Sequence, residues 1–118
     1  MTTTVTVRIR ESIWYGRALT QPPPTERELQ LPVGGTFVLT FHGERHVCTV
    51  TQIDPTAVDI TPVGAPPAVV TGAGGIGPDR MAAPTRLAVG ESVRLSPWTL
   101  DAGAIWEITV REIQYTSE

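Results

Sequence analysis

The sequence predicts an all-β fold, either a β-sandwich or a small β-barrel of about seven or eight short antiparallel strands. Thr and Val are the commonest residues, at 17 and 13 of 118, and both suit a pleated sheet better than a helix. No stretch repeats apolar residues at helical spacing over three turns. Gly- and Pro-rich turns separate segments in which apolar and polar residues alternate. At this length we expect a single domain over residues 1–118.

The N-terminal strand is predicted from Val5, Val7 and Ile9, which alternate with Thr and Arg and therefore form one apolar face. The alternation breaks at Glu11–Ser12, where we expect a bulge or bend. A Pro-rich link is expected over residues 20–28, because three consecutive prolines lack backbone donors and favour an extended, exposed chain.

A β-hairpin is the clearest local prediction. Gly43-Glu44 suits a two-residue type II′ turn between strands at 36–41 and 46–53. In that register Leu39 lies opposite Cys48, and directly opposed residues share a face of the sheet. The face expected to be buried carries Phe37, Leu39, Phe41, His46, Cys48 and Val50.

The segment from Gly64 to Arg86 contains five Gly, four Pro and only three charged residues. We interpret it as one long loop with a brief strand at Val69–Thr71. Loops of this length are usually functional or disordered. Its apolar side chains distinguish it from a solvated linker. The sequence leaves open whether it packs on its own domain or on a partner.

Two segments of the sequence resemble each other. Leu31-Pro-Val-Gly-Gly-Thr-Phe-Val-Leu39 matches Leu87-Ala-Val-Gly-Glu-Ser-Val-Arg-Leu95, and each is followed by a second strand. The match has two explanations, which are duplication and convergent use of Val-Gly as a bend before a strand. We favour convergence at this level, because two copies are fewer than a solenoid needs.

Composition excludes several classes of protein and site. A single Cys allows no internal disulfide and no multi-cysteine metal site. The net charge of −3 argues against a nucleic-acid partner. No apolar run is long enough for a membrane span and no signal-peptide core is present, so we expect no membrane association. A cytoplasmic protein is expected, or a virion component if the chain comes from a phage.

Candidate catalytic groups are few. His42, His46 and Cys48 form the one cluster of ligand-type side chains, but the predicted register points His42 away from the other two. Burial of Cys48 in the hairpin is incompatible with an activated nucleophile. Gly72–Gly77 has the spacing of a dinucleotide-binding loop, yet it lacks the strand–loop–helix context. We therefore predict no catalytic residue, no metal, no cofactor and no enzyme activity.

The predicted function is a non-enzymatic protein–protein interaction or a structural subunit, in a phage-like or multi-protein bacterial assembly. A protein partner or a second copy would bind through the loops at 64–86 and 96–104. Trp98 is expected at the surface, where Trp often marks an interface hot spot, and Trp106 is expected in the core. The residues expected to contact a partner are Val69, Val70, Ile76, Arg80, Met81 and Trp98.

Two alternatives remain open from the sequence. One is a small-molecule or peptide-binding barrel, with a cavity of several hundred Å³ expected near Trp14 or Trp98. The other is a protease inhibitor that presents a loop such as Pro78–Met81.

Overall fold

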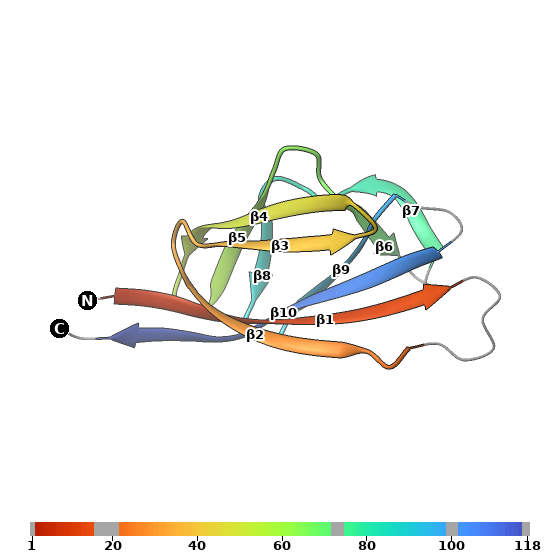
Figure 1. The fold of residues 1–118 in the computed structure, drawn as a ribbon. Helices are drawn as coiled ribbons and strands as arrows, with labels where there is room; N and C mark the ends of the chain where they lie inside the picture. Colours follow the sequence, from red (N-terminus) through yellow and green to blue (C-terminus); the bar gives the residue numbers. More distant parts are fainter. Residues whose placement is uncertain (1, 16–21, 72–74, 99–101, 117–118) are drawn as a thin grey trace.

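The computed structural model describes residues 2–15, 22–71, 75–98 and 102–116 (Figure 1). Those residues contain ten strands and no helix, and therefore no helix that could cross a membrane. The strands are β1 (Thr2–Tyr15), β2 (Thr25–Pro32), β3 (Thr36–Phe41), β4 (Glu44–Ile53), β5 (Ala57–Val63), β6 (Ala68–Thr71), β7 (Gly75–Arg80), β8 (Thr85–Ala88), β9 (Ser92–Ser96) and β10 (Ala102–Thr116).

The strands form two antiparallel sheets that pack face to face as a sandwich (Figure 1). The larger sheet has the order β2-β1-β10-β9-β6-β7 and the smaller one β3-β4-β5-β8. The predicted all-β, single-domain fold is confirmed, and the sandwich is the form adopted. The molecule is elongated, 53 × 26 × 26 Å, because the long strands β1 and β10 run along most of its length.

The core lies between the sheets and follows from the period-2 alternation of the strands. Trp106 is fully buried, as predicted, and is the largest buried side chain. The buried cluster is Val5, Val7, Ile9, Phe37, Leu39, Phe41, Cys48, Val50, Val58, Ile60, Met81, Leu87, Leu95, Ala104, Trp106, Ile108 and Val110.

The bulge predicted in the first strand is wrong. β1 pairs with β10 without a break at Glu11–Ser12, and the register shifts instead between Thr6 and Val7, where Arg111 of β10 is the extra residue. Because β1 keeps its phase, Glu11 lies on the same inward face as the apolar residues before it. The break in alternation therefore marks a polar residue at an inward position.

The β3–β4 hairpin forms, but its turn is His42-Gly43 and not the predicted Gly43-Glu44. Both turn residues have positive φ, 48° and 85°, which is the type I′ geometry that matches the twist of the strands. Leu39 therefore pairs with His46 instead of Cys48. Each residue of β3 thus pairs with a residue of β4 that lies two positions earlier than predicted. Because side chains alternate between the faces with a period of two, every side chain stays on its predicted face. The six residues expected to be buried are buried.

Two predicted irregular segments are shorter than expected. Residues 64–86 are not one long loop, because they contain β6 and β7, which pair with each other, and the start of β8. β6 also pairs with β9, so the segment extends one edge of the larger sheet. Gly and Pro are tolerated on edge strands, where fewer backbone donors are needed. The Pro-rich link at 20–28 ends earlier than predicted, since β2 begins at Thr25.

The two similar sequence segments form the same turn. The N–H of Gly34 donates to the carbonyl of Val50 at 2.7 Å, and the N–H of Gly90 donates to the carbonyl of Val110 at 2.7 Å. The N–H of each valine donates in turn to the carbonyl of the residue after the glycine, at 2.9 and 3.2 Å. The φ angles of the two glycines, 88° and 90°, also agree.

The similarity extends from the turns to the sheets. The order β3-β4-β5-β8, which we call the first repeat, recurs as β9-β10-β1-β2, the second repeat, within the larger sheet. One residue is skipped at the equivalent point of each repeat, Thr51 after Val50 and Arg111 after Val110. Convergent turn chemistry would explain two similar turns, but it does not require the strand registers and bulges to match as well. The chain therefore contains a repeated four-stranded unit, and convergence is the weaker explanation of the sequence similarity. Among the residues that the structure describes, no strands of the other unit correspond to β6 and β7.

Candidate functional site

The six residues predicted to contact a partner separate into exposed and buried groups. Trp98 is 40% exposed and Arg80 is exposed, whereas Val69 is half-buried. Val70 and Met81 are buried in the protein's own interior, at 8% and 4% exposure, so in this conformation they present little surface to a partner. Ile76 lies in β7, and its side chain is outside the described part of the chain.

Trp98 is held from three sides. Its backbone N–H donates to the carboxylate of Glu44, with N–O distances of 3.0 and 3.2 Å. Its indole Nε1–H donates to the carbonyl of Pro66 at 3.1 Å. The guanidinium carbon of Arg80 lies 5.3 Å from the ring centroid, which is within cation–π range. The ring is therefore fixed in position while much of its surface still faces solvent.

These contacts join segments that are distant in the sequence. Glu44 begins β4 in the smaller sheet, Pro66 lies between β5 and β6, and Arg80 ends β7. The two segments predicted to bind partners, 64–86 and 96–104, thus meet each other at Trp98. Of the second segment, Thr99, Leu100 and Asp101 lie outside the described residues.

His46 lies beneath this cluster and is 3% exposed. Its Nδ1 lies 2.9 Å from the carbonyl of Ala65, which can only accept, so Nδ1 carries a proton. Its Nε2 lies 2.6 Å from the carboxylate of Glu44. The ring also makes an edge contact with Trp106, with centroids 6.0 Å apart. Glu44 therefore links the buried imidazole to the backbone of Trp98.

The sulfur and imidazole groups do not converge on one point. Among the residues that the structure describes, no group of three or more His, Cys, Asp or Glu is arranged to hold a metal ion. Cys48 is fully buried, and burial raises the pKa of its thiol from the usual 9.0 to about 11. At neutral pH it is a protonated thiol inside the core, which is a structural environment.

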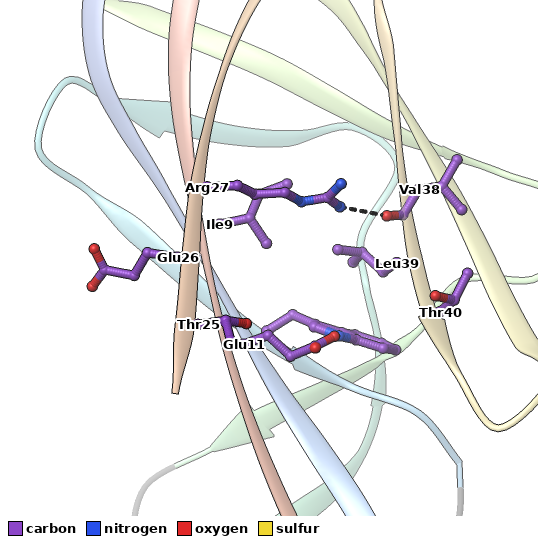
Figure 2. Close-up of a pocket in the computed structure, with 9 residues that line it drawn as sticks. Ile9, Glu11, Thr25, Glu26, Arg27, Val38, Leu39 and Thr40 are labelled. Carbon is purple, nitrogen blue, oxygen red and sulfur yellow. Dashed lines mark hydrogen bonds between the residues drawn. The ribbon is translucent and has the colours of Figure 1, made fainter. Parts of the chain in front are cut away.

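A groove of about 520 Å³ opens between β2 and β3, the edge strands of the two sheets (Figure 2). The indole Nε1–H of Trp106 donates to Glu11 at 2.9 Å on its wall. Arg27 spans the opening, with its Nη2–H donating to the carbonyl of Val38 at 2.7 Å, whereas Glu26 points away from the groove (Figure 2). The lining residues are Ile9, Glu11, Thr25, Glu26, Arg27, Val38, Leu39, Thr40 and Trp106.

The sequence predicted a cavity near Trp14 or Trp98, and Trp98 is not among the residues that line this groove. The side chain of Trp14 is outside the described part of the chain, so that part of the prediction is not tested. The sequence signal that could have located it is the carboxylate of Glu11 at an inward position of an otherwise apolar strand face. The segment Pro78–Met81, considered as an inhibitory loop, contains the end of β7 and the buried Met81.

A scan against models of protein families, a search of curated proteins and a search of solved structures each found no match to this chain.

Proposed function

We propose that the protein is a non-enzymatic interaction or structural subunit that binds a protein partner, or a second copy of itself, through the surface around Trp98 and Arg80. We further propose a multi-protein assembly, bacterial or phage-like, as its setting. The observation that carries the proposal is the fixed indole of Trp98, a residue that is 40% exposed. Trp and Arg are the residue types most enriched in interface hot spots.

Pre-organisation supports this assignment. Binding costs free energy when a side chain must be ordered at the interface, and that cost falls when the side chain is already held. Three contacts hold Trp98 in the free protein: those to Glu44, Pro66 and Arg80. Beneath the ring, His46 contacts Glu44 and the carbonyl of Ala65, and Glu44 also accepts from the backbone N–H of Trp98. These polar groups already have partners within the protein, so the exposed surface of the indole is available for apolar contact.

The test compares two exposed aromatic residues. Tyr115 is 49% exposed and lies near the end of β10, at the opposite end of the sandwich from the start of β4 (Figure 1). Trp98→Ala should weaken self-association or partner binding by at least about 30-fold, as expected for a hot spot. Tyr115→Ala should leave binding unchanged.

The readout has two parts. Light scattering after size exclusion, over a range of concentrations, measures self-association. A photo-crosslinking amino acid at the exposed Ala65, which precedes the Pro66 that accepts from the Trp98 indole, is compared with one at position 115 and identifies a partner in the source cells while Trp98 stays in place. The proposal fails if the protein is a strict monomer and crosslinking is no stronger at 65 than at 115. Circular dichroism of each variant confirms that the fold is retained.

A further inference from the structure

The groove between β2 and β3 has a counterpart in the second repeat. When the two similar segments are aligned, Leu39 and Thr40 of β3 correspond to Leu95 and Ser96 of β9. The cross-strand partners of the two leucines are His46 in β4 and Trp106 in β10, which therefore also correspond. Leu39, Thr40 and Trp106, which line the groove, therefore correspond to Leu95, Ser96 and His46.

In that other repeat the equivalent space is filled by the chain itself. Ala68 and Val69 of β6 pair antiparallel with the Ser96–Leu95 edge of β9. The carbonyl of Ala65 contacts His46, the counterpart of Trp106. The filling segment, residues 65–70, has the sequence Ala-Pro-Pro-Ala-Val-Val and lies between β5 and β8 of the first repeat, where the second repeat has no equivalent strands among the described residues.

At the groove itself, β3 is an edge strand. Its one neighbour in the sheet is β4, and the carbonyl of Val38 points away from β4 to accept from Arg27. Main-chain groups of alternate residues point the same way along a strand. The N–H and C=O of Thr40 therefore also face the groove, where no strand of the described residues pairs with them.

We propose that this groove binds an extended peptide segment of a partner protein, which adds antiparallel to β3 at Leu39 and Thr40 as β6 adds to β9. Adding a strand to an exposed sheet edge is a general mode of peptide recognition. The segment carries Pro, Ala and Val-like side chains, because the equivalent site is filled by such residues. Leu31 and Leu87 pair with Val5 and Val58, which therefore correspond, and counting along the chain from these pairs places Ala83 and Gly64 where the groove has Arg27 and Glu11. Arg27 and Glu11 thus supply polar side chains at two positions where the filled site has none.

A segment of another protein fits better than a second copy of this chain. The strand of this protein that has the required sequence, β6, is already paired on both sides with β7 and β9. Its transfer to another molecule would break both pairings. This site shares no residue with the Trp98 surface, so the two proposals are tested independently.

The test uses a capped synthetic peptide with the sequence of residues 64–71, Gly-Ala-Pro-Pro-Ala-Val-Val-Thr. Two derivatives carry a single backbone N-methyl group, one on the Ala that corresponds to Ala68 and the other on the following Val. Because the main-chain groups of Thr40 face the groove, the N–H of that Ala donates to β3 and the N–H of the Val points away. Amide chemical shifts of the intact ¹⁵N-labelled protein report binding.

The unmodified peptide should shift the amides of residues 36–41 and the indole N–H of Trp106 saturably. Methylation of the Ala should weaken binding at least about tenfold, because it removes a hydrogen bond and adds a clash, whereas methylation of the Val should have little effect. In the protein, Thr40→Pro should abolish binding and Thr40→Val, which keeps the N–H, should preserve it. If Thr40→Pro does not fold, the peptide pair alone decides the outcome.

Four results would overturn the proposal. Three come from the peptide titrations: no saturable shifts up to about 5 mM peptide, equal binding of the two methylated peptides, and shifts confined to β7 or β9. Concentration-dependent shifts of residues 36–41 without peptide would overturn it in favour of a second copy as the occupant.

Discussion

Glu11 and Trp106 lie directly opposite each other on β1 and β10, and the carboxylate of Glu11 accepts the indole N–H at 2.9 Å. Trp106 is fully buried, so its one polar group has to find a partner within the protein. The pair satisfies that requirement and places a carboxylate on the wall of the groove.

We expect Glu11→Ala to lower the free energy of unfolding by about 1–3 kcal/mol, because it leaves a buried donor without an acceptor. Glu11→Gln keeps an acceptor and should cost less than about 1 kcal/mol. Urea unfolding followed by tryptophan fluorescence measures both. Equal stability of the Ala and Gln variants would contradict the role given to this hydrogen bond.

The two repeated turns predict equal effects of equivalent substitutions. Gly34 and Gly90 have φ of 88° and 90°, and a Cβ at either position would meet no atom within 4 Å. Gly34→Ala and Gly90→Ala should therefore each cost about 1–2 kcal/mol, which is the backbone cost of a left-handed conformation in a residue with a side chain.

Gly35→Ala serves as the contrast to these two variants. Its backbone is not left-handed, but the added Cβ would lie 3.0 Å from the carbonyl oxygen of Pro32 and 3.1 Å from Cβ of Leu31. The cost at this position comes from crowding. Thermal unfolding measures the loss of stability in all three variants, and clearly unequal losses at positions 34 and 90 would count against structural equivalence of the turns.

Asp54 should make stability depend on pH in the acid range. Hydrogen bonds from Arg86 and from Gln52 hold the pKa of Asp54 below its usual 3.8. A carboxyl with a lowered pKa in the folded state stabilises the protein above its unfolded pKa. That contribution is lost as the pH falls through the folded value.

Side-chain carboxyl shifts measured by NMR should place the midpoint of Asp54 below 3.8, and Arg86→Gln should move it upward. Urea midpoints measured below about pH 4 should fall less steeply in Asp54→Asn than in the parent protein. An Asp54 titration midpoint that stays the same in Arg86→Gln would contradict the prediction.

Cys48 should make stability depend on pH in the alkaline range. Burial raises the pKa of its thiol from 9.0 to about 11, so the folded state disfavours the thiolate. This contribution to the free energy of unfolding is fully present below pH 9 and declines as the pH rises toward the folded-state pKa of about 11. The total decline is on the order of 2–3 kcal/mol. Cys48→Ala should unfold with a flatter pH dependence between about pH 8 and 11.

Thiol labelling tests the same environment directly. At about pH 8 a thiol reagent should modify the native protein only at the rate of unfolding, and it should modify the urea-unfolded chain at once. Rapid labelling of the native protein would show that Cys48 is accessible.

Local pattern determined a large part of this structure. Alternation alone predicted that Val5, Val7 and Ile9 would be buried and that Trp106 would lie in the core. The period of a strand is two residues, so which face a side chain occupies depends only on its phase. The hairpin illustrates the point, because its buried face was predicted correctly even though its turn was placed one residue too late.

Non-local pairing was decided only by the tertiary structure. The strands at 68–71 and 75–80 are rich in Gly and Pro or flanked by them, and they form because the edge of β9 is available for pairing. The contacts that fix Trp98 and the groove beside Glu11 join residues far apart in the chain. The energies of such contacts depend on how two sheets pack against each other, and periodicity within one segment carries no information about that packing.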